Sequence, residues 1–270
     1  MIKYNLDELI QLVYCKELNN SEKKYLDTLL TGLDNQVNTS NQWLNSDEGL
    51  TLFEDKPDDV KQYLQDSRLY SNLLKIINNN VDDSLDHIED FYNTGKEVAD
   101  KQLGYALGFL PSDKEALAIL TNYNAGLITD INTELMTGIL ATIGAGVIGG
   151  VVLSEVNERV LELPKTPLDS PVSVETRVTS TAMTEYSRSV NTGTLQSYAN
   201  AGGTQVEIVT AGDGLVCDEC LDLEANNPYT LKEMPGLIPV HPNCRCGVYL
   251  LEGEDENPTD PIIIDLTPEE

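Results

Sequence analysis

Cys217-Asp-Glu-Cys220 and His241-Pro-Asn-Cys244-Arg-Cys246 lie within thirty residues near the C-terminus and hold four of the five cysteines and one of the two histidines. A Cys-x-x-Cys pair followed about twenty residues later by a histidine and a cysteine is typical of sites where two chain reversals bring nitrogen and sulfur ligands to one tetrahedral metal ion. The spacing predicts a small metal-binding module, with zinc as the expected ion. The expected ligands are Cys217, Cys220, His241 and Cys244, with Cys246 either replacing His241 or remaining a free thiol.

The predicted metal site is structural rather than catalytic. Four protein ligands close the coordination shell, whereas a catalytic zinc keeps one position open. Asp218, Glu219 and Asp222 are close enough in sequence to serve as general bases, but in a chain with 45 acidic residues they are expected to form a solvated rim. We therefore expect no enzymatic activity.

Disulfides or unliganded thiols are the alternatives to a metal site. The N-terminus carries charged residues where a secretion signal would need an apolar core, so we expect the protein to be made in a reducing cytoplasm. In that compartment a cysteine cluster is more often a metal site than a disulfide pair.

The chain is strongly acidic. Its 17 basic and 45 acidic residues give a formal net charge of -28. A molecule with this charge repels nucleic acid and anionic membranes at long range, and its basic residues are scattered singly rather than clustered. Charge therefore does not indicate DNA contact, although an acidic protein can approach DNA through a partner, and it can bind basic protein surfaces directly.

Residues 1–162 are predicted to be mostly helical, because apolar residues recur there at spacings of three and four. Ser21 is the expected N-cap of one helix. A longer pattern is interrupted by Asn78-Asn79-Asn80, where a break is expected. A capping box that begins at Ser112, directly after Pro111, predicts the start of another helix.

Residues 135–153 contain no charged side chain and include five glycines. That length can just span a bilayer. The glycines lower helix propensity, however, and no aromatic or basic residues anchor the ends of the run. We expect a buried, closely packed glycine-rich helix or helical hairpin, with a membrane-inserting segment as the alternative.

Three prolines in residues 163–173 predict a linker, since each proline fixes φ and removes a backbone donor. The linker separates residues 1–162 from a module at 174–251. Residues 252–270 are acidic and contain prolines, which predicts a disordered tail. The expected fold class is α+β: a mostly helical N-terminal region, then a small α+β module with a structural zinc site.

Within the module, residues 174–199 are predicted to form a helix that ends at Gly202-Gly203. Residues 205–210 alternate between apolar and polar side chains, as a strand does. Residues 247–251 are expected to pair with them across the metal site.

Two further motifs accompany the cysteines. Thr184-Glu185 is followed by a basic residue, Arg188, and by Asn191, and the second cysteine motif extends from Pro239. In this order, the motifs resemble the C-terminal domain of the phage head morphogenesis proteins, the Mu F-like minor capsid family. The resemblance covers roughly residues 135–250. It is strongest over 176–248, although a polar segment, Leu221-Asp-Leu-Glu-Ala-Asn-Asn-Pro228, stands where the family usually has a glycine-rich one.

The resemblance implies a minor head protein of a tailed phage or prophage. Such a protein would associate with the portal vertex and act in head morphogenesis, DNA packaging or ejection. Its partners would be the portal protein and the major capsid or scaffolding protein. It would be found in the virion, in the head interior or at the portal vertex, and in the host cytoplasm during assembly.

Two other functions remain open on the sequence. One is a metal-dependent hydrolase or nuclease that uses Glu219 or Asp222. The other is a membrane-active ejection protein in which residues 135–153 contact the membrane during ejection.

Overall fold

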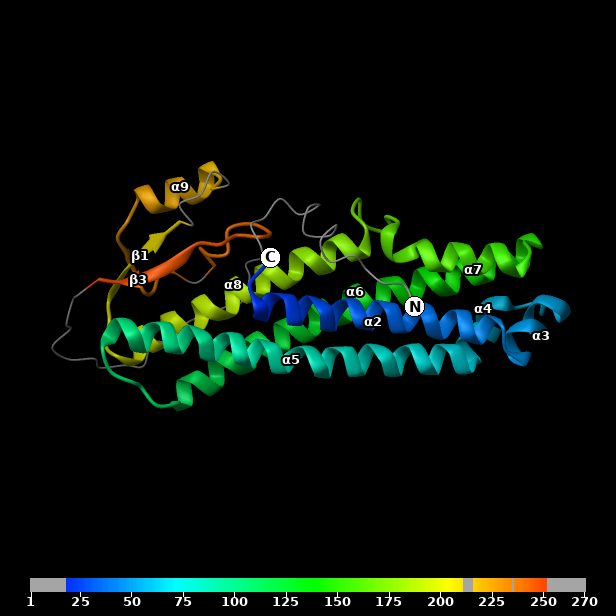
Figure 1. The fold of residues 1–270 in the computed structure, drawn as a ribbon, viewed down its shortest axis with the longest axis horizontal. Helices are drawn as coiled ribbons and strands as arrows, with labels where there is room; N and C mark the ends of the chain where they lie inside the picture. Colours follow the sequence, from blue (N-terminus) through cyan, green and yellow to red (C-terminus); the bar gives the residue numbers. More distant parts are fainter. Residues whose placement is uncertain (1–17, 211–215, 235, 252–270) are drawn as a thin grey trace. The chain divides into compact units, whose positions relative to one another are not determined.

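The computed structural model describes residues 18–210, 216–234 and 236–251; the predicted disordered tail at 252–270 lies outside them. The described chain is mostly helical, with a small sheet of three strands near its C-terminal end (Figure 1). The predicted combination of a helical region with a small α+β module is therefore confirmed.

The chain divides into two compact units. Among the described residues, unit 1 comprises Lys23–Ser84 and Ala125–Thr179. Unit 2 comprises 18–22, Leu85–Asn124 and the described residues from Ser180 onward. Four helices, α2, α5, α6 and α8, contribute residues to both units, and the domain boundaries predicted at 162 and 174 stay predictions.

The helices are α2 (Asn20–Leu44), α3 (Asp47–Asp55), α4 (Val60–Asp66), α5 (Arg68–Leu103), α6 (Pro111–Gly149), α7 (Leu153–Glu162), α8 (Val174–Asn200) and α9 (Asp218–Ala225), with a short 3-10 helix η1 (Leu163–Lys165) after α7. The strands are β1 (Gln205–Val209), β2 (Tyr229–Thr230) and β3 (Gly247–Leu250).

Helix α2 is capped by Asn19, not by Ser21 as predicted. The Asn19 side-chain oxygen accepts hydrogen bonds of 2.9 Å from the backbone N–H groups of Ser21 and Glu22. The Glu22 carboxylate in turn accepts a bond of 2.7 Å from the Asn19 N–H. This reciprocal pair is a capping box, and it places the helix start before the expected residue.

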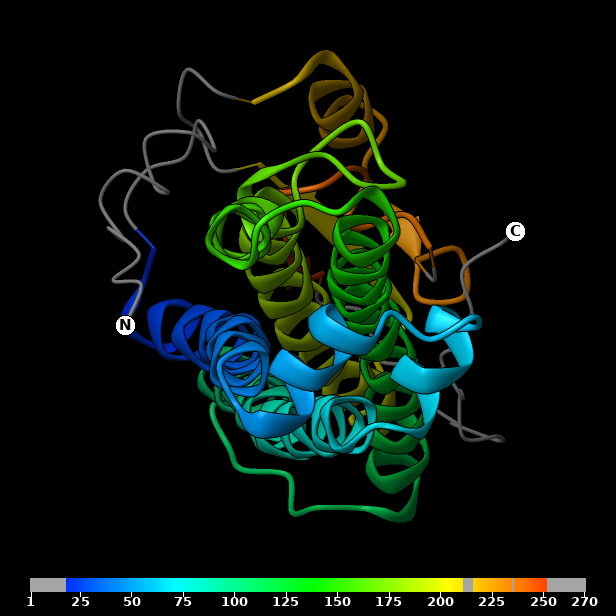
Figure 2. The ribbon, with the colours of Figure 1, turned by 90° about the vertical axis from the view of Figure 1, so that its right-hand side faces the viewer.

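The predicted break at Asn78-Asn79-Asn80 is wrong, because α5 is continuous through it. Asn80 is buried in unit 1 and donates to the carbonyl of Thr28 on α2, at 2.8 Å. The side-chain oxygen of Asn80 accepts a bond from the Asn132 amide group. The side-chain oxygen of Asn132 in turn accepts a bond from Gln36. These hydrogen bonds satisfy the buried amide groups, so asparagine can occupy the interior of a helix. They also connect α5 to α2, which lies beside it in Figures 1 and 2.

The predicted helix is present as α6, but it begins at Pro111, before the expected cap, and Ser112 does not cap it. The buried carboxylate of Asp113 accepts a hydrogen bond of 2.7 Å from the N–H of Leu110. Ser112 instead donates to the side-chain oxygen of Asn200, at 2.8 Å. The capping role thus belongs to the third helical residue, which reaches back to the residue before the helix.

Residues 135–153 form the end of α6, a turn and the start of α7, which is the predicted helical hairpin. Leu135, Ile139, Ile143 and Val147 are fully buried. By length and composition α6 is the one helix in the described ranges that could cross a membrane, and 44% of its most apolar stretch is buried.

No long helix continues through residues 163–173, as the prolines predict. This segment contains η1 and an antiparallel bridge between Pro167 and Ser173. Helix α8 then extends almost as predicted. It ends where the N–H of Gly203 donates to the carbonyl of Tyr198, with Gly202 in the left-handed region at φ 81°. A positive φ at this position is the usual helix-ending conformation and favours glycine.

The sheet has the order β2-β1-β3, and both pairings are antiparallel. The predicted pairing of residues 205–210 with residues 247–251 is confirmed, with Val206 opposite Leu250 and Ile208 opposite Val248. Strand β2 and helix α9 were not predicted, because a strand of two residues and a helix of eight carry little periodicity.

Within unit 2, α8 packs closely against α5 at two glycines. A Cβ atom added to Gly193 would lie 2.1 Å from the carbonyl oxygen of Tyr92, and one added to Gly95 would lie 2.0 Å from that of Val190. The Thr194 hydroxyl also donates to the Gly95 carbonyl, at 3.0 Å. Both helices therefore require glycine at these positions. The close contact fixes this part of α8 against α5.

Candidate metal centre

The first cysteine pair is organised by the start of α9. Cys217 is the N-cap residue, with extended backbone angles, and its sulfur accepts a bond of 3.4 Å from the N–H of Cys220. Cys220 lies one helical turn later and is buried, at 3% exposure. The spacing of three residues therefore places both thiols at the N-terminal end of one helix, where the partial positive charge favours thiolate.

The second motif forms a tight turn. The N–H of Cys244 donates to the carbonyl of His241, at 3.1 Å, and Asn243 has a φ of 65°. Pro242 occupies the second position of this turn, where its fixed φ is suitable, and asparagine occupies the third, where a positive φ is needed. His-Pro-Asn-Cys thus encodes a type II turn that directs His241 and Cys244 to the same side.

The two turns bring the predicted ligands together. The donor atoms of Cys217, Cys220 and His241 all lie within 4.8 Å of one another, as do those of Cys220, Cys244 and Cys246. The Cys220 sulfur is 3.4 Å from His241 Nε2 and 3.9 Å from the Cys244 sulfur. Cys220 is common to both groups, and none of these four cysteines forms a disulfide. The buried cluster of Cys220, Cys244 and Cys246 can hold a metal ion.

Hydrogen bonding and burial divide the thiols into two kinds. The pKa of Cys244 is lowered to about 5, chiefly by the hydrogen bond it receives from the Cys246 thiol. The pKa of Cys217 is lowered by the N–H of Cys220. Burial raises the pKa of Cys220 to about 12, and donation to Cys244 raises that of Cys246. The cluster therefore retains protons that a bound cation would displace.

The cysteines are also part of the module's apolar core. Their buried neighbours come from α5, α8, the three-stranded sheet and the segment between the two cysteine motifs: Ala99, Leu195, Tyr198, Val206, Ile208, Leu231, Met234, Ile238 and Val248. This core is small, so a bound metal would contribute a large part of the module's folding free energy.

Helix α8 supports the second turn through two side chains. The N–H of Asn243 donates to the Thr184 hydroxyl, at 2.9 Å. Seven residues further along α8, about two helical turns, the Asn191 amide donates to the carbonyl of Cys246, at 2.8 Å. Both side chains belong to the motif quoted for the family resemblance, but their contacts with the cysteine turn could not be derived from sequence.

Glu185 and Arg188 form a separate ion pair on α8, in which the carboxylate is buried and the guanidinium is partly exposed. The Arg188 guanidinium lies 3.1 Å from the Glu185 carboxylate and 5.1 Å from the centre of the Tyr123 ring. Asn124 donates a further bond of 3.2 Å to the same carboxylate. Burial nevertheless raises the pKa of Glu185, against the opposing effects of Arg188 and Asn124.

Arg245, between the last two cysteines, contacts a carboxylate of the same chain. Its guanidinium is 3.2 Å from the carboxylate of Glu22, which is 1% exposed. Burial raises the pKa of Glu22, while Asn19 and Arg245 act in the opposite direction. The ion pair joins the cysteine turn to the first turn of α2, a link between residues far apart in sequence.

Two polar contacts missed by sequence analysis connect β1 to the segment around α9. The side chain of Asn227 both accepts from the N–H of Ile208 and donates to its carbonyl, each at 2.8 Å. The carboxylate of Glu224 accepts two bonds of 3.0 Å from Thr210. These contacts give a structural role to the polar segment that departs from the family pattern.

The acidic residues considered as general bases lie on the outer side of α9. Asp218, Glu219 and Asp222 are all exposed, as expected for a solvated rim.

No family model matches the chain, and no curated protein or solved structure matches it either.

Proposed function

We propose that the cysteine cluster is a structural zinc site. Zinc–sulfur bonds of about 2.3 Å and zinc–nitrogen bonds of about 2.0–2.1 Å, at tetrahedral angles, place two sulfur ligands about 3.8 Å apart and a sulfur and a nitrogen about 3.6 Å apart. The observed distances from the Cys220 sulfur are 3.9 Å to the Cys244 sulfur and 3.4 Å to His241 Nε2. These two donor pairs therefore already have nearly the spacing that zinc requires.

The proposed ligands are Cys217, Cys220, His241 and Cys244. They come from the N-terminus of α9 and from the type II turn, so each turn supplies two ligands. In this proposal Cys246 is a neighbour that hydrogen-bonds to the sulfur of Cys244, and it is also the alternative fourth ligand. A closed shell of four protein ligands leaves no position for substrate, which suits a non-enzymatic role.

The chain is proposed to be a minor head protein of a tailed phage or prophage. The observation that supports this most is the pair of bonds from Thr184 and Asn191 to the cysteine turn. The helix motif and the cysteine motif, which separately resemble the Mu F-like minor capsid family, are thereby parts of one folded module. A shared function for the two motifs explains why both occur in one chain.

As a minor head protein, the chain would associate with the portal vertex in the head and take part in morphogenesis, DNA packaging or ejection. Its partners would be the portal protein and the major capsid or scaffolding protein. The net charge of -28 supports protein rather than nucleic-acid partners.

The role can be tested in the phage or prophage genome that encodes the chain. Copies of the chain in purified particles would be counted by quantitative mass spectrometry, and infectivity would be measured in parallel. We expect the wild-type chain in particles, and we expect Cys220→Ser to reduce both its incorporation and infectivity. Purified particles that lack the wild-type chain, with normal infectivity after deletion of its gene, would contradict the proposal.

A further inference from the structure

The loop between α5 and α6 exposes an unusual amount of apolar surface. Residues 104–110 read Gly-Tyr-Ala-Leu-Gly-Phe-Leu, without one charged side chain in a chain that is 23% charged. Tyr105, Phe109 and Leu110 are 51%, 46% and 38% exposed. Contiguous exposed apolar side chains with a polar border are a common mark of an interaction site.

Buried polar groups at its base hold the loop in shape. The N–H of Gly104 donates to the carbonyl of Asp100, and the Asp100 carboxylate accepts a bond of 3.0 Å from the N–H of Leu107. At the other end, Asp113 binds the N–H of Leu110 and forms an ion pair of 2.9 Å with Lys96. The surface is thus preformed, which lowers the entropic cost of binding.

Phe109 is fixed from its inner side. Its ring lies 6.4 Å from the ring of Tyr92 and 5.7 Å from the ammonium of Lys96. The Tyr92 hydroxyl donates in turn to Asp113, at 2.8 Å. One part of the Phe109 ring is therefore packed, while the other is presented to solvent.

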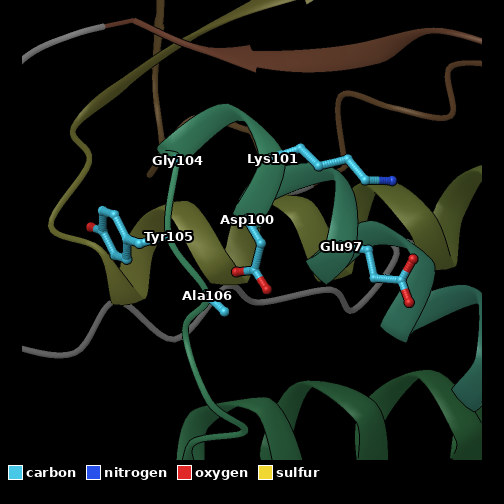
Figure 3. A pocket seen from close by; sticks show the side chains of 6 residues that line it. All are labelled: Glu97, Asp100, Lys101, Gly104, Tyr105 and Ala106. Atoms are coloured by element: carbon cyan, nitrogen blue, oxygen red, sulfur yellow. The ribbon is translucent and has the colours of Figure 1, made fainter.

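An open hollow of about 430 Å³ lies where α5 meets the loop (Figure 3). It is lined by two acidic residues, one basic residue, one tyrosine and two small residues: Glu97, Asp100, Lys101, Tyr105, Gly104 and Ala106. The C-terminal end of a helix carries partial negative charge, which adds to that of the two carboxylates. In Figure 3 the Asp100 carboxylate lies nearer to Tyr105, while the ends of the Glu97 and Lys101 side chains both point away from the Tyr105 ring.

We propose that this loop and hollow form a docking surface for a basic segment of a partner protein. An arginine side chain of the partner enters the hollow near the Glu97 and Asp100 carboxylates and lies against the ring of Tyr105. An apolar residue next to that arginine covers Phe109 and Leu110. Arginine fits because its guanidinium binds carboxylates and stacks on aromatic rings.

The charge of the chain argues for this occupant. A net charge of -28 repels nucleic acid, anionic membranes and a second copy of the chain, and it attracts basic protein surfaces. The surface is also separate from the metal centre: in both Figure 1 and Figure 2, the loop lies at the opposite side of unit 2 from α9. The proposal thus stands independently of the proposed zinc site.

The test is an NMR titration of the full-length, isotope-labelled chain with two peptides, acetyl-Leu-Arg-Leu-amide and its citrulline counterpart. The peptides differ only in charge at the central side chain. We expect the arginine peptide to shift the signals of Gly104, Tyr105 and Ala106, and we expect the citrulline peptide to shift them less. Raising the salt concentration should weaken the effect, because exposed charges are screened.

Two substitutions outside the loop's supporting contacts sharpen the test. Glu97→Gln and Tyr105→Ser should each weaken binding of the arginine peptide by about two- to fivefold, the range expected for exposed ion pairs and comparable contacts. The matched control is Glu89→Gln, which removes an exposed carboxylate from the same helix outside the hollow. It should leave binding unchanged.

Three results would overturn the proposal. The first is equal shifts with both peptides, or shifts that do not involve the loop. The second is equal binding by the Glu97→Gln and Glu89→Gln variants. The third is a dimer of the free chain, seen by sedimentation, that Tyr105→Ser dissociates, since the occupant would then be a second copy.

Discussion

The side-chain amide of Asn191 on α8 donates a hydrogen bond of 2.8 Å to the backbone carbonyl of Cys246. Both groups are buried, and 55 residues separate them in sequence. The bond connects the long helix to the last residue of the cysteine cluster, just before β3. Helix, cluster and sheet are thus parts of one structure, and each should respond to changes in the others.

Replacing Asn191 should destabilise the module. The Asn191→Ala change leaves the carbonyl of Cys246 buried without its donor, which typically costs about 1–3 kcal/mol. We expect a loss of that size in the free energy of unfolding, measured by urea denaturation of the metal-loaded chain. Asn122→Ala, at an exposed position of α6, is the control and should have little effect. Equal stabilities for the two variants would show that the hydrogen bond is unimportant.

The cysteines should contribute unequally to metal binding. Cys220 belongs to both groups of donors, so Cys220→Ser should reduce the bound metal to a trace. Cys246→Ser removes a neighbour of a ligand in the proposed set, and loss of such a neighbour typically weakens binding by about 10- to 100-fold. Zinc affinities would be measured by competition with a chromophoric chelator. A larger loss for Cys246→Ser than for Cys220→Ser would require a different ligand set.

The close approach of α8 and α5 predicts a contrast between two glycines. A methyl group at Gly193 would lie 2.1 Å from the carbonyl oxygen of Tyr92, whereas one at Gly126 would meet no atom within 4 Å. Gly193→Ala should therefore destabilise the protein by about 1–3 kcal/mol. Gly126→Ala should stabilise it by up to about 1 kcal/mol, because alanine favours helix. Thermal unfolding of both variants checks the prediction, and a harmless Gly193→Ala would contradict the packing described.

Glu185 predicts a specific pH dependence. Its pKa lies above its ordinary value of 4.5, mainly because the group is buried. A carboxyl group of this kind contributes stability that is fully present below its unfolded pKa and is lost as the pH rises through its folded pKa. The uncharged Glu185→Gln variant should therefore gain stability relative to the wild type as the pH rises from the ordinary carboxyl pKa of 4.5 through the raised pKa of Glu185.

Denaturation curves of the two proteins across that range would show the difference. Glu115→Gln, at an exposed position of α6, is the control and should give a nearly constant difference. A Glu185→Gln variant that loses stability relative to the wild type as the pH rises would mean that the Arg188 ion pair outweighs burial.

Periodicity and turn chemistry were sufficient for much of the fold. The boundaries of α8 follow from the prolines before it and the glycines after it, and the β1–β3 pairing follows from alternating side chains. The cysteine and histidine spacing also predicted that these side chains lie near one another, since two short turns need no long-range information. Which of them bind a metal stays a prediction.

Other features depend on contacts that no local pattern encodes. Asn78-Asn79-Asn80 looks like a break, but Asn80 finds partners on α2 and α6 that stabilise it inside a helix. Ser21 and Ser112 resemble caps, yet Asn19 and Asp113 provide the capping bonds. The links from Thr184, Asn191 and Glu22 to the cysteine turn join residues more than fifty positions apart, so only the folded chain reveals them.

Native mass spectrometry of the full-length chain, with elemental analysis of its metal and a count of reactive thiols before and after chelation, tests directly whether the cysteine cluster is a structural zinc site. On the zinc proposal we expect one zinc per chain, and we expect chelation to release the metal, expose the four clustered thiols and loosen the module. A folded, metal-free chain whose clustered cysteines are paired in disulfides would contradict it.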